Sequence, residues 1–427
     1  MQVGIGPIVT ASIVMQLLGG ANLLGLDTDD PRDQVLYQGL QKLLVIVMTA
    51  LTALPMVFAG GFLPTVDQLA IGGFEFVGTQ IQMLMFLQIF AGGILILYMD
   101  EVVSKWGVGS GIGLFIIAGV SQRLVTGFIS PSPEGFFYSW YQIIFTDDVV
   151  VGSVLTSDGL YTLIMGQGDL LALFTTVLIF AVVVYAESVR VEIPLSHARV
   201  KGARGRFPVK LIYASVLPMI LVRALQANIQ FIGTILFTVG PDGEAGPIVL
   251  MGRELPWLGV YADGGQPVAG FFYYTAPIYN PTDWMWWTGE VAGDPEVWQI
   301  LIRISIDLTF MVIGGAIFAI FWVETTNMGP KATARQIQNS GMQIPGFRQN
   351  VGVIEKVMER YIPQVTVIGG ALVGLLAVMA NMLGTIGAVT GTGLLLAVSI
   401  TYKLYEEIAE EQMMEMHPMM RQMFGKE

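Results

Sequence analysis

Long apolar stretches recur along the whole chain, and this pattern limits the fold more than any other feature. A helix rises about 1.5 Å per residue, so roughly 20 consecutive apolar residues cross the 30 Å of a bilayer core. Only 13% of the residues are charged, whereas soluble domains carry about 25%. We therefore predict an all-α, polytopic membrane protein. Its nine expected spans lie roughly at 4–20, 42–61, 80–98, 111–127, 169–189, 211–237, 299–322, 361–380 and 388–403.

The charges of the connecting segments set the expected orientation. Lysine and arginine gather in alternate connections, namely those near 21–42, 99–110, 190–210 and 323–360 and the C-terminal tail. The connections on the other face contain a single basic residue, Arg253. Since positive connections stay in the cytoplasm, we expect a multi-pass protein of the cell membrane with a cytoplasmic C-terminus. An odd number of crossings then places Met1 outside, so we expect more chain before it in the complete protein.

Composition argues against several kinds of chemistry. There is no cysteine, so thiolate nucleophiles, disulfides and cysteine-bound metals are excluded. The two histidines, His197 and His417, do not show a metal-ligand spacing. The glycine-rich run 107–113 lacks the Gly-Lys-Ser/Thr ending of a phosphate-binding loop. We predict no metal, no cofactor and no enzymatic activity.

Few polar side chains lie inside the expected spans. Asp307 is the one clear acid there, and Arg303 precedes it by one helical turn. This spacing predicts a structural ion pair between the two residues. The scarcity of ionisable groups favours a passive conduit driven by a partner. The alternative is a secondary transporter of a small solute, which usually needs a denser charged site at membrane depth.

Residues 190–210 form a strongly basic segment in a protein of net charge −12. Topology or anionic lipid head groups explain many such segments. A phosphate-rich partner, such as ribosomal RNA, is the second explanation. Both explanations are open on composition alone.

Several long strings resemble archaeal members of the SecY family, and they occur in the family's order along nearly the whole chain. They are GIGPIVTA at 4–11, YQGLQKLL at 37–44, DEVVSK at 100–105, GSGIGLFI at 109–116, RVEIPL at 190–195, FWVETT at 321–326 and GTG at 391–393.

The resemblance implies a fold of ten helices, arranged as two pseudo-symmetric halves around a central pore. The nine expected spans correspond to the second through tenth family helices. The first helix and most of the plug helix that seals the pore are absent from this sequence. Residues 1–200 correspond to the N-terminal half, together with a helix near 169 that starts the second half. Residues 201–427 make up the remainder of the C-terminal half, with its basic cytoplasmic loop at 323–360.

The resemblance also implies a function, which is to pass secretory polypeptides across the membrane and membrane segments sideways into it. A ring of aliphatic side chains would line the constriction, and a hydrophobic constriction impedes ions without binding a sliding chain. Its residues here are Ile5, Val9, Ile112, Ile116, Ile220 and Leu396. A lateral gate would lie between the first two spans and those at 211–237 and 299–322. Its polar positions are Thr10, Thr52 and Asn228.

Partners are implied in the same way. Lys201, Arg204 and Arg206 in the first basic loop, and Arg348 in the second, match segments that dock the ribosome in this family. A SecE-type subunit and a small beta-type subunit would complete a heterotrimer. Signal sequences, nascent polypeptides and membrane lipids would be the other partners.

Overall fold

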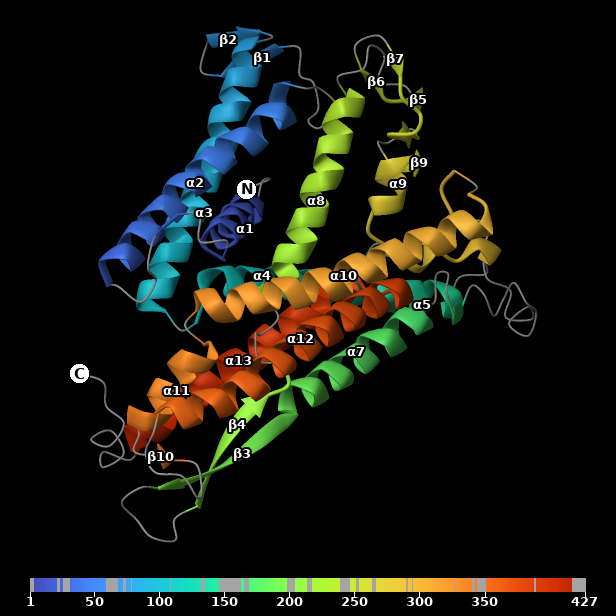
Figure 1. Cartoon of the computed structure of the whole chain (residues 1–427). Coiled ribbons are helices and arrows are strands. Elements are labelled where there is room, and N and C mark those ends of the chain that lie inside the picture. Colours follow the sequence, from blue (N-terminus) through green and yellow to red (C-terminus); the bar gives the residue numbers. More distant parts are fainter. Residues whose placement is uncertain are drawn as a thin grey trace. The chain divides into compact units, whose positions relative to one another are not determined.

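The chain is mostly helical, as the sequence predicts (Figure 1). The computed structural model describes residues 4–20, 24–25, 31–58, 68–71, 74–77, 79–107, 109–131, 135–145, 163–164, 169–197, 204–212, 217–238, 246–250, 253–262, 266–288, 291–293, 295–326, 328–339, 342–343, 351–387 and 389–416.

The longer helices follow the apolar stretches. They are α1 (Gly6–Gly20), α2 (Pro31–Phe58), α3 (Thr79–Trp106), α4 (Gly111–Ile129), α7 (Leu170–Ser188), α8 (Leu217–Thr238), α10 (Val297–Thr325), α12 (Val351–Leu383) and α13 (Gly391–Met416). Shorter helices are α5 (Phe136–Phe145), α9 (Phe271–Thr275) and α11 (Pro330–Asn339).

Each expected span coincides with one of the longer helices, but several helices extend beyond it. The α2 helix begins at Pro31 instead of 42, α12 begins at Val351 instead of 361, and α13 ends at Met416 instead of 403. Hydropathy falls at the first charged residues, whereas backbone hydrogen bonding continues into water, so apolar patterns underestimate helix length.

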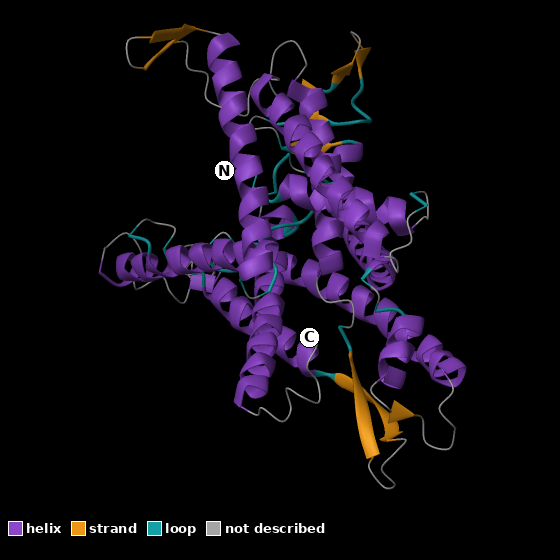
Figure 2. Ribbon diagram, turned by 90° about the vertical axis from the view of Figure 1, so that its left-hand side faces the viewer, coloured by secondary structure: helices purple, strands orange, loops and turns teal. Residues whose placement is uncertain are grey.

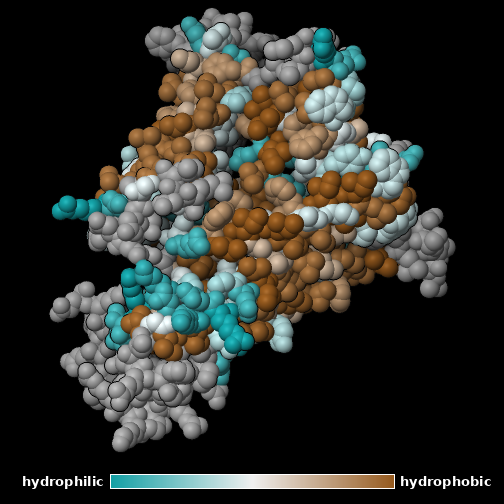
Figure 3. Space-filling model, viewed as in Figure 1, coloured by the Kyte–Doolittle hydropathy of each residue, from teal (hydrophilic) through white to brown (hydrophobic). Residues whose placement is uncertain are grey.

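By length and hydropathy, 7 helices of the described chain could cross a membrane, and these are α2, α3, α4, α7, α8, α10 and α12. The apolar part of α1, Gly6–Gln16, is shorter, and the C-terminal part of α13 carries Lys403, Glu406 and Glu407. Large exposed apolar side chains such as Phe174 and Leu51 cover these helices, and hydrophobic patches dominate the face shown in Figure 3. Such surfaces require a lipid or protein covering.

Short strands depart from a purely helical chain. The basic segment expected as a loop forms a hairpin of β3 (Arg190–His197) and β4 (Arg204–Lys210), drawn as long arrows in Figure 2. Its register pairs Val191 with Val209, and pairs of β-branched residues stabilise antiparallel strands. The other strands are β1 (Gln68–Ile71), β2 (Phe74–Val77), β5 (Gly246–Pro247), β6 (Val249–Leu250), β7 (Arg253–Glu254), β8 (Val260–Tyr261), β9 (Pro267–Ala269) and β10 (Met342–Gln343).

Two compact units divide the chain. Unit 1 consists of residues 1–98, 190–278 and 282–375, and unit 2 consists of residues 99–189, 279–281 and 376–427. Each unit takes segments from both sides of residue 200. The family resemblance divides the chain at residue 200 instead, and that division stays a prediction.

Glycines bring helix backbones into contact within unit 1. A Cβ on Gly370 of α12 would lie 2.5 Å from the carbonyl oxygen of Gly315 in α10, so a larger residue does not fit between these helices. A Cβ on Gly374 would lie 2.4 Å from the Met311 carbonyl oxygen of α10. Small residues allow this close approach, and α10 and α12 therefore pack as a tight pair.

Two apolar clusters stabilise the ends of unit 1. One joins β4, α10, α11 and α12 through Val209, Ala319, Val323, Ala334, Ile337, Ile354, Met358 and Ile362. The other surrounds Ile248, Tyr261 and Phe272, next to α8. Burial raises the pKa of the Tyr261 phenol to about 12, so this group stays neutral at ordinary pH.

In unit 2, α13 packs against α4 and α7. Gly113 of α4 lies close to Ile400 of α13. The amide nitrogen of Ile386 donates to Thr176 Oγ1 of α7 at 3.2 Å. The Asn381 side chain accepts from the Thr392 amide at 2.8 Å, which ties the end of α12 to the start of α13.

Candidate functional site

A seam between helices lies inside unit 1, where α1 packs against α2, α8 and α10. These are the four helices between which the sequence predicts a lateral gate. The buried residues of α1 include the apolar Ile8, Val9, Ala11, Ile13 and Met15 and the polar Gln16. Most of the contact between α1 and its neighbours is therefore apolar, and polar groups at the seam stand out.

One hydrogen bond crosses the seam from α8 to α1. The Asn228 side-chain amide donates to Thr10 Oγ1 at 3.1 Å. The structure thus brings two of the three predicted gate residues together. Thr52, the third, donates to the Met48 carbonyl of its own helix at 2.7 Å and has no described contact across the seam.

A second polar contact was missed by the sequence reasoning. The Gln41 side-chain amide of α2 donates to Ser12 Oγ of α1 at 2.8 Å. Ser12 interrupts the apolar run of α1, and a polar side chain inside an apolar helix is a signal for a polar partner on a neighbouring helix. The contact ties α1 to α2.

The predicted constriction residues divide between the two units. Ile5 directly precedes α1 and Val9 lies in its first turn, with the Val9 amide donating to the Ile5 carbonyl at 3.1 Å. Ile220 lies in the first turn of α8. These belong to unit 1. Ile112 and Ile116 of α4 and Leu396 of α13 belong to unit 2, where the two helices pack together. The predicted ring therefore takes residues from both units, and it stays a prediction.

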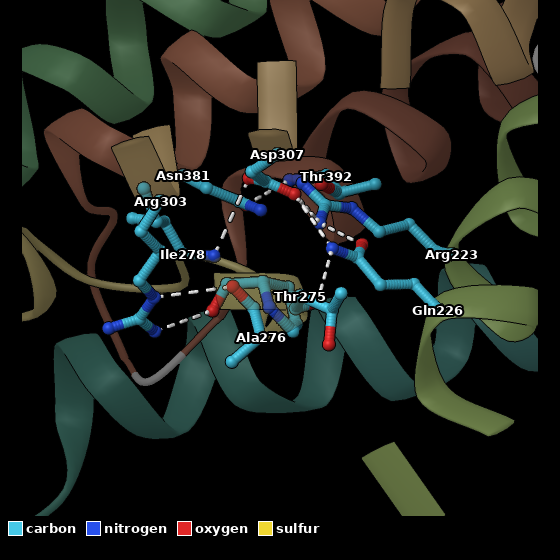
Figure 4. Close-up of polar contacts among 10 residues, drawn as sticks. Arg223, Gln226, Thr275, Ala276, Ile278, Arg303, Asp307, Asn381 and Thr392 are labelled. Carbon is cyan, nitrogen blue, oxygen red and sulfur yellow. Dashed lines mark hydrogen bonds and ion pairs between the residues drawn. The ribbon is translucent and has the colours of Figure 1, made fainter. Parts of the chain in front are cut away.

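A buried carboxylate connects α8 with α10. Asp307 of α10 is 1% exposed. Its Oδ1 accepts from Arg223 Nη1 at 3.1 Å and from Gln226 Nε2 at 2.9 Å, both of α8 (Figure 4). Its Oδ2 lies 3.5 Å from the Ile278 amide nitrogen. Gln226 also accepts from Arg223 at 2.7 Å, so both α8 side chains are held together as well as to α10.

The predicted ion pair between Arg303 and Asp307 is wrong. Arg303 donates instead to the backbone carbonyls of Ala276 at 3.3 Å and Pro277 at 3.1 Å, as Figure 4 shows. Its guanidinium also lies 5.0 Å from the centre of the Tyr273 ring. The segment after α9 offers Arg303 its unpaired carbonyls, whereas Asp307 meets a cation from another helix.

The α9 region completes this network. Gln226 Nε2 donates to the Thr275 carbonyl at 3.2 Å, and Gln230 Nε2 donates to Thr275 Oγ1 at 3.1 Å. Burial raises the pKa of the Tyr273 phenol, although the charge of Arg303 opposes the shift, so the phenol is neutral beside the guanidinium. Residues 271–278 are therefore bonded to α8 and to α10 at once.

The basic segments meet in one sheet of unit 1. Strand β10 pairs with β3, placing Met342 opposite His197 and Gln343 opposite Ser196. Arg204 and Arg206 lie on β4, which pairs with β3 along its length. Lys201 and Arg348 lie outside the described residues. The two basic connections are thus joined by backbone hydrogen bonds.

Acidic and histidine side chains do not assemble into a metal site in the part of the chain that the structure describes. The candidate site is accordingly an arrangement of helices and hydrogen bonds.

Comparison with known proteins gives matches along nearly the whole chain. Residues 1–405 match the family model described as SecY. The chain is 71% identical to the protein translocase subunit SecY of Haloarcula marismortui, covering 100% of this chain and 85% of that protein. It is 39% identical to the corresponding subunit of Methanocaldococcus jannaschii, covering 99% of this chain and 83% of that protein.

Solved structures agree with these matches. A structure of a protein-conducting channel superposes with a TM-score of 0.75 at 38% identity, covering 98% of this chain and 83% of that one. Sec61 in the canine ribosome-channel complex superposes with a TM-score of 0.71 at 36% identity, again covering 98% and 83%.

Proposed function

Because the chain belongs to the SecY family, we propose that it is the pore-forming subunit of a protein-conducting translocation channel. It is a multi-pass membrane protein that lets secretory polypeptides cross and membrane segments leave sideways. One observation carries this assignment, which is the match of residues 1–405 to the family model together with the fold. A channel subunit needs no chemistry of its own, in line with the few ionisable groups at membrane depth.

The ring of Ile5, Val9, Ile112, Ile116, Ile220 and Leu396 is proposed to line the constriction. The placement of Ile5, Val9 and Ile220 on packed helices of one unit, and of the others on packed helices of the other unit, supports this role. Aliphatic side chains impede ions and offer a moving polypeptide no strong binding site.

The seam between α1, α2, α8 and α10 is proposed to be the lateral gate. The Asn228–Thr10 hydrogen bond supports this role, because it joins two sides of the seam by one neutral contact. Such bonds in membranes average about 0.6 kcal/mol, which is small enough for a passing apolar segment to replace.

The basic segments are proposed to dock the ribosome through Lys201, Arg204, Arg206 and Arg348. Support comes from the pairing of β3 with both β4 and β10, which unites the two segments, and from the similarity to a Sec61 chain seen with a ribosome. Phosphate contacts of this kind weaken as salt rises.

Further partners and the orientation are proposed from the family. They are a SecE-type subunit, a small beta-type subunit, signal sequences, nascent polypeptides and membrane lipids. The positive connections support a cytoplasmic C-terminus in the cell membrane. Residues 1–200 are proposed to hold the N-terminal half and the helix near 169 that starts the second half, and residues 201–427 the remainder of the C-terminal half.

Site-specific crosslinking tests the function. A photoreactive residue replaces Ile112, Ile220 or Leu396 in membranes that contain the partner subunits and a stalled secretory chain. We expect crosslinks to the secretory chain from all three positions. The exposed residues Val125 of α4 and Ile232 of α8 serve as controls on the same helices. Crosslinks from the controls alone would refute the pore, and substrate-dependent uptake of a small solute would favour a transporter.

A further inference from the structure

The contacts between helices on the same side of the seam differ in strength from the contacts across it. On the side of α8 and α10, Asp307 is a buried carboxylate that accepts from Arg223 and Gln226 of the other helix. Hydrogen bonds to a charged group are about twice as strong as neutral ones. Separating α8 from α10 would leave the Asp307 carboxylate and the Arg223 guanidinium without the opposite charge that each now contacts, which is strongly unfavourable.

The segment between the two helices strengthens this connection. Residues 276 and 277 give their carbonyl oxygens to Arg303 of α10, while the Thr275 carbonyl accepts from Gln226 of α8. Ile278 donates its amide toward Asp307. A short stretch of backbone is therefore bonded to both helices, so neither helix can move away without breaking several bonds.

On the other side of the seam, α1 and α2 are also bonded to each other. Gln41 of α2 bonds Ser12 of α1 at 2.8 Å. A Cβ on Gly93 of α3 would meet Thr49 of α2 within 2.4 Å, so α2 and α3 are in close contact. Helix α2 thus contacts both α1 and α3, independently of α8 and α10.

Across the seam, the described polar contact is the neutral bond from Asn228 to Thr10. The buried side chains of α1 are otherwise mostly apolar, with Gln16 as a buried polar residue, and α1 contacts both α8 and α10. Lipid tails or an apolar segment can replace such packing at little cost, because they are as apolar as the helices. The weakest boundary in this group of helices therefore runs between α1 and α8.

We propose that Asp307 is a positioning residue that holds α8 on α10, so that α8, α9 and α10 move as one body when the gate proposed above opens. This inference rests on the proposed channel function. In this body Arg223 and Gln226 are the partners of Asp307, and residues 275–278 fill the contact between the helices. The body presents Asn228 to the seam as a fixed group.

Cysteine pairs test the proposal, because the chain has no cysteine of its own. Val222→Cys with Gly314→Cys joins α8 to α10. A Cβ at position 314 would lie 3.8 Å from the Val222 Cβ, and disulfides have a mean Cβ separation of about 3.8 Å. Thr10→Cys with Asn228→Cys joins the two sides of the seam, at the position where Asn228 Nδ2 now donates to Thr10 Oγ1 at 3.1 Å.

The assay is insertion of a membrane segment by the complete complex in membranes, for each pair in reduced and oxidised form. We expect oxidation of the 222–314 pair to change the insertion rate less than about twofold. Oxidation of the 10–228 pair should slow it at least about tenfold, because the disulfide holds the closed state. A loss with the 222–314 pair equal to that with the 10–228 pair would overturn the single body.

The role of Asp307 is measured separately from transport, by the rate at which the 222–314 pair oxidises. We expect Asp307→Asn to slow this rate about threefold or more, since the charge that aligns the helices is gone. Ser305→Ala is the matched control on α10, because its hydroxyl donates to Leu301 of the same helix. A Thr49→Cys and Gly93→Cys pair reports general loosening and should oxidise at the same rate in all variants.

An unchanged 222–314 rate in Asp307→Asn would refute the positioning role whatever the transport result. If the reduced forms of every pair and the parent protein all failed to insert the segment, while the 222–314 rates followed the expectation, the channel function would fail and the positioning role would stand.

Discussion

The buried pair of Arg223 and Asp307 makes a quantitative prediction about stability. Asp307 accepts two short hydrogen bonds from α8, at 3.1 and 2.9 Å. Hydrogen bonds to charged groups contribute about 1.5 to 3 kcal/mol each. Changing Asp307→Leu removes both and leaves the Arg223 guanidinium buried, and breaking a buried pair in this way costs about 3 to 5 kcal/mol.

The double variant Arg223→Met with Asp307→Leu separates two explanations of that loss. If most of it comes from the unpaired cation, the double variant should recover all but about 1 to 2 kcal/mol, which reflects the lost partners of the Ile278 amide and of the Gln226 side-chain oxygen. Gln226 keeps the Thr275 carbonyl as an acceptor at 3.2 Å, but its side-chain oxygen loses the hydrogen bond from Arg223 and therefore contributes to the remaining loss.

The assay is the fraction of purified complex that stays monodisperse after heating. The Asp307→Leu variant should fall at the lowest temperature, the double variant should lie close to the parent, and Ser305→Ala should match the parent. A double variant that is less stable than Asp307→Leu would refute the reasoning, because it would mean that the ion pair itself, and not the avoidance of a lone charge, stabilises the helices.

Three further predictions concern the seam, the helix packing and pH. Asn228→Leu should remove about 0.6 kcal/mol of stabilisation from the closed seam, so that less hydrophobic signal sequences are inserted, as measured with a graded series of signals. Thr10→Val should shift the series in the same direction, and an unchanged series would contradict the gate assignment. Gly370→Val should lower stability by about 1 to 3 kcal/mol or more through overpacking. Gly119→Ala, with nothing within 4 Å of the new Cβ, should leave stability unchanged, and equal melting temperatures for the two variants would refute the close packing. Burial raises the pKa of Tyr261 to about 12, above the unfolded value of about 10. The neutral phenol therefore contributes fully to stability below about pH 10, and this contribution is lost as the pH rises towards about 12. Tryptophan fluorescence should show this loss of stability in the parent protein and a smaller loss in Tyr261→Phe.

Hydropathy was sufficient to predict the helices, because spanning a bilayer leaves few alternatives to an apolar helix. It was insufficient for the hairpin of β3 and β4. Residues 190–210 combine turn formers with basic side chains, which conceal the alternation of Val191 and Ile193 with polar residues, and the pairing partner Val209 lies beyond the turn.

The polar contacts divide in the same way. Thr10 and Asn228 were predicted as gate residues from family strings, and the structure brings them together. The partner of Asp307 was predicted wrongly, because helical spacing favours Arg303 whereas the observed partner, Arg223, lies 84 residues away. A contact between helices depends on their packing, which local spacing does not specify.

The distance along the chain between Arg223 and Asp307 also has a consequence for biogenesis. Ribosomes add about 5 to 20 residues per second, so the 84 residues between them take roughly 4 to 17 seconds to synthesise. During that interval an isolated α8 would carry an unpaired arginine, which costs about 2.5 to 3.5 kcal/mol at the centre of a helix in a membrane. The nascent α8 should therefore stay in a protein-lined or interfacial environment until α10 arrives, and the two helices should enter the lipid together.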